Sequence, residues 1–142
     1  MAPGQAAIFI GFLVVASACD LRTRRIPNRL NAAGLLAVVA VAFAEDRAGG
    51  VACIGWAFTL AAGPLAIHLA RPAGLGGGDV KMTAVIGAAL GPLGALALVV
   101  GCLMALLALP AARSVGWLPG AARHIPLAPF LAAGALATMA GT

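Results

Sequence analysis

Residues 82–112 read MTAVIGAALGPLGALALVVGCLMALLALPAA and contain no charged side chain. As a single helix this run would be about 46 Å long, whereas the hydrocarbon core of a bilayer is about 30 Å thick. Gly91-Pro92-Leu93-Gly94 interrupts the run, and a Gly-Pro pair is a strong turn signal. The sequence therefore predicts two helices here, a short one over about 80–90 and a full membrane span over about 93–110.

The composition of the whole chain is that of a membrane protein. Of its 142 residues, 63% are hydrophobic and 9% are charged, and the mean hydropathy is +1.07. Soluble domains carry about 25% charged residues, so an ordinary soluble domain is excluded, as is a disordered segment. The net charge of +5 comes from basic residues scattered through apolar sequence, which do not form a nucleic-acid-binding face. Three distant cysteines without a CxxC spacing indicate small buried residues, not a disulfide framework or a metal site.

The remaining charge-free runs supply four further helices. Residues 1–19, 48–70 and 124–142 are each long enough to cross a membrane, and 30–44 is short but sufficient. The first run lacks the basic n-region of a cleaved secretory signal, so we expect it to be retained. The sequence thus predicts an all-α fold, a six-helix transmembrane bundle that forms one integral-membrane domain over residues 1–142.

The distribution of basic residues predicts the orientation of this bundle. Lys and Arg concentrate in the cytoplasmic loops of membrane proteins. With six helices and both termini outside, eight of the nine basic residues fall on the cytoplasmic side and only Arg47 outside. Without the break at Gly91, six basic residues would fall on the cytoplasmic side and three outside. The eight cytoplasmic residues are Arg22, Arg24, Arg25, Arg29, Arg71, Lys81, Arg113 and Arg123.

Two of the four acidic residues occupy unusual positions. Glu45 and Asp46 belong to the short external loop, whereas Asp20 directly follows a 19-residue apolar run. Asp79 opens the short fourth helix after a glycine-rich segment. A carboxylate near the hydrocarbon is unfavourable, by about 2.5–3.5 kcal/mol at the bilayer centre. The predicted topology places both aspartates at the cytoplasmic end of the bundle.

Each of these aspartates also has a purely structural interpretation. Asp20 would be an interfacial acid paired with Arg22 or Arg24, and Asp79 would be the N-cap of its helix. Taken together, the two suggest chemistry, because two neighbouring carboxyls that share a proton act as general acid and general base in hydrolysis. Glycines before Asp79 would let an extended substrate backbone approach closely.

Local patterns predict the conformation of three further segments. Pro27 and Asn28 predict a turn and then a helix, with Asn28 as a good cap. Lys81 is expected to extend its ammonium group to the membrane interface. His68 and His124 are expected to be packed or interfacial histidines, not catalytic bases.

Three segments of the chain carry a resemblance to a known family. They are Asp20-Leu21-Arg22-Thr23-Arg24-Arg25-Ile26-Pro27-Asn28, Gly76-Gly77-Gly78-Asp79-Val80-Lys81-Met82 and Ile125-Pro126-Leu127-Ala128-Pro129-Phe130-Leu131. They resemble the D…R…IPN segment, the GxGD motif and the IPxxPFL segment of the type IV prepilin peptidases, in order and over essentially the whole chain. The resemblance implies that Asp20 and Asp79 are the catalytic aspartates of an intramembrane aspartyl peptidase, whose short fourth helix starts at the GxGD motif. The expected supporting residues are Arg22, Ile26, Pro27, Asn28, Gly76, Gly77, Gly78, Lys81, Pro126 and Pro129.

The same resemblance implies a substrate and a location. The substrate would be a prepilin or pseudopilin, including Flp-type precursors, whose short basic leader is removed at the cytoplasmic face during type IV pilus assembly or protein secretion. The enzyme would lie among the lipids of the bacterial or archaeal-like cytoplasmic membrane, with no metal, no organic cofactor and no nucleic-acid partner. Many longer members carry a four-cysteine zinc region and methylate the new N-terminus. This chain has no CxxC, so we expect a peptidase without methyltransferase activity.

The sequence leaves the branch of the family open, and two other functions compete. The short form resembles the tight-adherence branch, whereas the IPxxPFL segment resembles the general type IV or type II secretion branch. Another GxGD protease, of the presenilin or signal-peptide-peptidase kind, would need a Tyr-Asp motif and more spans, and the chain has no tyrosine. A non-enzymatic bundle, such as a transporter or assembly subunit, would explain the small-residue packing but not the two aspartates.

Overall fold

The structure is a bundle of helices, as the sequence predicts. The computed structural model describes residues 1, 3–71, 75–114 and 126–141, and these form six helices and no strand. The helices are α1 (Pro3–Thr23), α2 (Asn28–Glu45), α3 (Arg47–Ala70), α4 (Gly77–Leu90), α5 (Leu93–Ser114) and α6 (Ala128–Ala140). The predicted all-α, six-helix fold is confirmed.

The predicted break within residues 82–112 lies at Gly91. This residue has a φ of 57°, a left-handed conformation that other residues rarely adopt, and its N–H donates to the Gly87 carbonyl at 2.9 Å. These features end α4, and Leu93 then begins α5. At its other end α4 begins at Gly77, so the short fourth helix does start inside the GxGD motif.

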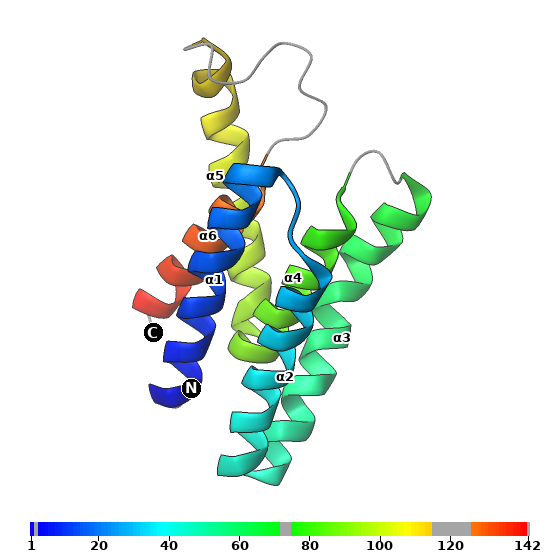
Figure 1. Ribbon diagram of the computed structural model, residues 1–142, viewed down its shortest axis with the longest axis vertical. Helices are drawn as coiled ribbons and strands as arrows, with labels where there is room; N and C mark the ends of the chain where they lie inside the picture. Colours follow the sequence, from blue (N-terminus) through cyan, green and yellow to red (C-terminus); the bar gives the residue numbers. More distant parts are fainter. Residues whose placement is uncertain (2, 72–74, 115–125, 142) are drawn as a thin grey trace.

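The short helix α4 lies at the centre of the bundle (Figure 1). It packs against each of the other five helices, and most extensively against α3. Three of its side chains, Met82, Val85 and Ile86, are completely buried. In Figure 1, α2 and α3 run side by side on one flank of α4, while α1, α5 and α6 lie on the other. This arrangement places the start of α4 next to the end of α1.

The outer surface of the bundle is apolar. Helices α1, α2 and α3 are long and apolar enough to cross a membrane, and α5 and α6 contain shorter apolar stretches, Leu93–Ala108 and Ala128–Ala140. Large apolar side chains face outward, including Leu36, Phe58 and Leu107, which are 69%, 76% and 74% exposed. A surface of this kind suits lipid and not water, in agreement with the composition.

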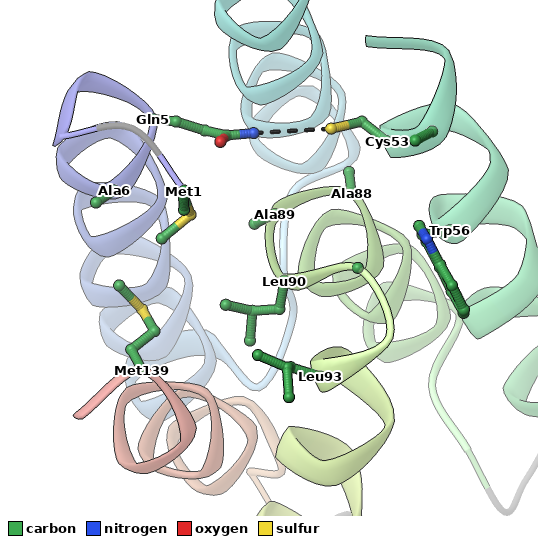
Figure 2. A pocket seen from close by; sticks show the side chains of 12 residues that line it. Met1, Gln5, Ala6, Cys53, Trp56, Ala88, Ala89, Leu90, Leu93 and Met139 are labelled. Atoms are coloured by element: carbon green, nitrogen blue, oxygen red, sulfur yellow. Dashed lines mark hydrogen bonds between the residues drawn. The ribbon is translucent and has the colours of Figure 1, made fainter. Parts of the chain in front are cut away.

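A cavity of about 520 Å³ opens at the end of the bundle where both termini lie in Figure 1, and Figure 2 shows the side chains that line it. Two of the residues that line it, Gln5 of α1 and Cys53 of α3, are joined by a hydrogen bond from Nε2 to Sγ of 3.8 Å. This contact gives the buried amide of Gln5 a partner inside an apolar helix. Of the three cysteines, Cys19 and Cys53 are half-buried but Cys102 is exposed, so the prediction of burial is wrong for Cys102. Its side chain lies on the outer surface of α5 and not in the core.

Helices α5 and α6 approach closely because Gly134 has no side chain. A Cβ at this position would collide with the Ala97 carbonyl oxygen and lie 2.6 Å from the backbone nitrogen of Gly101. Backbone atoms cannot rotate out of the way as a flexible side chain can. Small residues at this interface are therefore needed for the two helices to pack, as is common between membrane helices.

We expect Gly134→Ala to lower the free energy of unfolding by about 1–3 kcal/mol, because the added methyl group forces α5 and α6 apart. The matched control is Gly55→Ala in α3, where a Cβ meets nothing within 4 Å. The control should be neutral or slightly stabilising, because alanine favours helix over glycine. Thermal unfolding of the detergent-solubilised variants by circular dichroism measures both effects. Equal melting temperatures for the two variants would contradict this account of the interface.

Candidate active site

Asp20 lies in the last turn of α1 and is only 6% exposed. Its Oδ2 accepts a hydrogen bond of 3.0 Å from the backbone N–H of Ala128, the first residue of α6. The two residues are 108 positions apart in the sequence. The contact therefore joins the end of the first helix to the start of the last one.

The start of α6 leaves this N–H available for Asp20. The first N–H groups of a helix have no carbonyl partner within the helix itself. Pro129 has no N–H, and the two residues after it both donate to the Leu127 carbonyl at 3.1 Å. The N–H of Ala128 instead meets the Asp20 carboxylate. Pro126 and Pro129 thus flank the residue that contacts Asp20, although neither proline lines the cavity described below.

Asp79 is the third residue of α4, in its first turn. The N-cap of this helix is Gly76, so the interpretation of Asp79 as the N-cap is wrong. The carboxylate turns back over that glycine, since a Cβ on Gly76 would lie 3.0 Å from Oδ2 of Asp79. An acidic side chain in a first turn interacts favourably with the positive end of the helix dipole. Gly76 therefore provides the space in which the carboxylate lies.

Asp20 and Asp79 both line a cavity of about 380 Å³. Its walls come from the end of α1, the connection between α1 and α2, and the start of α4. A carboxyl from each of two separate helices thus borders the same space. The predicted site residues that line the cavity are Asp20, Ile26, Pro27, Asn28, Gly76, Gly77, Gly78 and Asp79.

The connection between α1 and α2 packs directly on the glycines before Asp79. A Cβ on Gly78 would lie 3.3 Å from the Cβ of Ile26, so a glycine at this position allows the two segments to approach. Buried Asn31 of α2 donates from Nδ2 to the Gly78 carbonyl at 3.3 Å. These contacts fix the glycine-rich segment against α2.

The N-cap of α2 differs from the one predicted. Pro27 is the N-cap of α2, and its carbonyl accepts the N–H groups of Leu30 and Asn31, whereas Asn28 is the first residue of the helix. The φ of −60° that the proline ring imposes suits this position. Asn28 Oδ1 instead accepts a hydrogen bond of 2.7 Å from Nζ of Lys81. Lys81 is exposed and binds α2 through this contact, and its extension to the membrane interface stays a prediction.

Two basic residues at the site were not among the expected site residues. Arg24, considered above as a partner of Asp20, and Arg25, interpreted only as a marker of orientation, both line the cavity. Arg24 has a φ of 52°, and its N–H donates to the Asp20 carbonyl at 2.8 Å, which closes the end of α1. The signal for them was the run of basic residues directly after Asp20. His68 is packed, as expected, with Nδ1 2.7 Å from the Leu75 carbonyl oxygen.

One further predicted residue lies outside the cavity, and others are not described by the structure. Arg22 is exposed on α1 and does not line it. Arg123, His124 and Ile125 fall outside the described residues. Within the described part of the chain, no group of three or more His, Cys, Asp or Glu side chains could hold a metal ion.

A family model matches most of the chain. The model of the type IV leader peptidase family matches residues 7–111, which include both aspartates. The match ends before the IPxxPFL-like segment at 125–131, so it does not bear on that segment. Searches of curated proteins and of solved structures gave no match.

We expect Asp20→Ala to be about 1 kcal/mol less stable than Asp20→Asn, which is the usual effect of losing a side-chain partner at a helix N-terminus. The amide oxygen of asparagine can still accept from the Ala128 N–H, whereas alanine leaves that donor buried without a partner. Melting temperatures of the two variants in the same detergent give the difference. If both variants melt at the same temperature, the Ala128 contact does not stabilise the fold.

Proposed function

Because the chain belongs to the type IV leader peptidase family, we propose that it is an aspartyl endopeptidase that removes the short basic leader from prepilin-like precursors, whether pilins, pseudopilins or Flp-type proteins. The observation that carries this proposal is the shared cavity, in which Asp20 from α1 and Asp79 from α4 border one space. We further propose that the chain acts as a peptidase without methyltransferase activity.

The chemistry follows from two carboxyls that share one proton. The ionised aspartate takes a proton from a water molecule, which attacks the carbonyl carbon of the scissile peptide bond. The protonated aspartate donates its proton to the carbonyl oxygen, and a proton is then delivered to the leaving nitrogen as the C–N bond breaks. The reaction needs only water and the two side chains.

The glycines of the motif suit a peptide substrate. Gly76, Gly77 and Gly78 line the cavity next to Asp79 and present no side chains to it. An extended peptide can therefore bring its own backbone close to the carboxyls. Ile26 and Asn31 contact this glycine segment and hold it in place, so the surface that would meet the substrate is fixed.

The charge distribution supports cleavage at the cytoplasmic face. Arg24 and Arg25 line the aspartate cavity, and Arg71 follows the end of α3 at the same end of the bundle (Figure 1). Arg47 begins α3 at the opposite end, where both termini also lie. Under the positive-inside rule this pattern favours an orientation with the aspartates in the cytoplasmic half of the membrane and the termini outside.

We expect both Asp20→Asn and Asp79→Asn to abolish processing when the protein is co-expressed with a cognate prepilin. Each variant keeps the size of the side chain but removes the group that takes or gives the proton, so activity should fall by at least about a hundredfold. Glu45→Gln, a change at the exposed end of α2, is the matched control and should process normally. The shift of the precursor on a gel measures cleavage, and normal cleavage by either asparagine variant would exclude the two-aspartate mechanism.

The orientation can be tested with reporter fusions. A reporter that is active only outside the cytoplasm should be active when fused after Glu45 and inactive when fused after Arg71. The reason is that the positive-inside rule places the α2–α3 turn outside and the residues after α3 inside. The reverse pattern of activity would exclude cytoplasmic cleavage.

A further inference from the structure

A second hollow runs along the side of the bundle from the aspartate cavity. It is a groove of about 490 Å³ between α2, α3 and α4. Its walls are apolar for most of their length, with Val39 from α2, Phe58 and Leu65 from α3, and Ala84 from α4. On α3 the lining extends from Ile54 to His68, about 21 Å at the rise of a helix. The groove is therefore long enough to hold several turns of another helix.

The groove meets the aspartate cavity at Gly77. This residue lines both spaces, so a chain that crosses it passes from one into the other. The polar residues of the groove, His68 and Lys81, are also at this end. A Cβ at position 77 would make an ordinary van der Waals contact of 3.6 Å with Nε2 of His68, so this histidine lies beside the junction of the two spaces.

We propose that this groove binds the apolar helix of the precursor, the segment that directly follows the cleavage site. The proposal rests on the proposed function, because it assigns a binding surface to the same active site. With the leader in the aspartate cavity and the scissile bond beside Gly77, the helix that follows must leave through an opening continuous with the cavity. The groove is such an opening, and its apolar walls match an apolar helix.

A membrane phospholipid fits the groove less well. A lipid would place an acyl chain against the apolar walls and its phosphate at the polar end. Both basic groups at that end already have protein partners, since Nζ of Lys81 binds Asn28 and Nδ1 of His68 binds the Leu75 carbonyl. The Asp79 carboxylate already lies at the positive end of α4, so a phosphate there would meet a negative charge, whereas glycine lets a peptide backbone approach closely.

Neighbouring alanines of α3 provide a matched pair of variants. Ala61 lines the groove, while Ala62 is exposed on a different face of the helix. We expect Ala61→Phe to raise KM for the full precursor by roughly ten- to a hundredfold with little change in kcat, the factor expected when one large apolar side chain can no longer be buried. Ala62→Phe should leave both constants unchanged. An unchanged KM for a folded Ala61→Phe variant would overturn the proposal.

Crosslinking tests the same surface without depending on how well Ala61→Phe folds. A photoreactive phenylalanine analogue replaces Phe58, at the groove, or Leu107, on the outer surface of α5, in the inactive Asp79→Asn protein. Incubation with a prepilin in vesicles should crosslink the precursor from position 58 and not from position 107. Crosslinks from position 58 to phospholipid alone, or from both positions equally, would overturn the groove proposal. If the wild-type protein cleaves the precursor in these vesicles, that result leaves the proposed function intact, whereas absence of cleavage by the wild type counts against the proposed function itself.

Discussion

The chain reverses direction at Gly91, where a left-handed backbone conformation ends α4 after 14 residues. A helix of this length is about 21 Å long, well short of the roughly 30 Å of a bilayer core. Because α4 packs against each of the other five helices, the space beside its first turn is bordered by the end of α1 and the connection between α1 and α2. The connection between α1 and α2 packs into this space, and the cavity with both aspartates occupies the remainder. The shortness of one helix therefore makes room for the site.

The features predicted from the sequence are those that depend on local composition. Apolar runs separated by charges indicated six helices, and the Gly-Pro pair at 91–92 divided the longest run at the correct place. The scarcity of acidic residues drew attention to Asp20 and Asp79, which the structure places at one cavity. In each case an unfavourable free energy is involved, that of a charge near lipid or of a helix longer than the bilayer core. This free energy depends on the residue and its immediate neighbours in the sequence.

The features that could not be predicted are contacts between distant segments. Asp20 meets Ala128, Asn31 meets Gly78 and Lys81 meets Asn28, across separations of 108, 47 and 53 residues. No periodicity or spacing encodes such pairs, because each depends on how whole helices are packed. The expected cap at Asn28 was wrong for a related reason. The preceding proline already had the backbone angles of an N-cap, which left the asparagine side chain available for a lysine from another helix.

The two aspartates are anchored to different parts of the bundle. Asp20 is bonded to the start of α6, which packs mainly on α5, whereas the glycine before Asp79 is bonded to α2, and α4 packs mainly on α3. Helices α1 and α4, which carry the two carboxyls, share only a small direct contact. The separation of the carboxyls therefore depends on how one layer, α2 with α3 and α4, is aligned along the other, α1 with α5 and α6. Shear of one layer along the other would assemble or separate the pair while both anchoring hydrogen bonds stay intact.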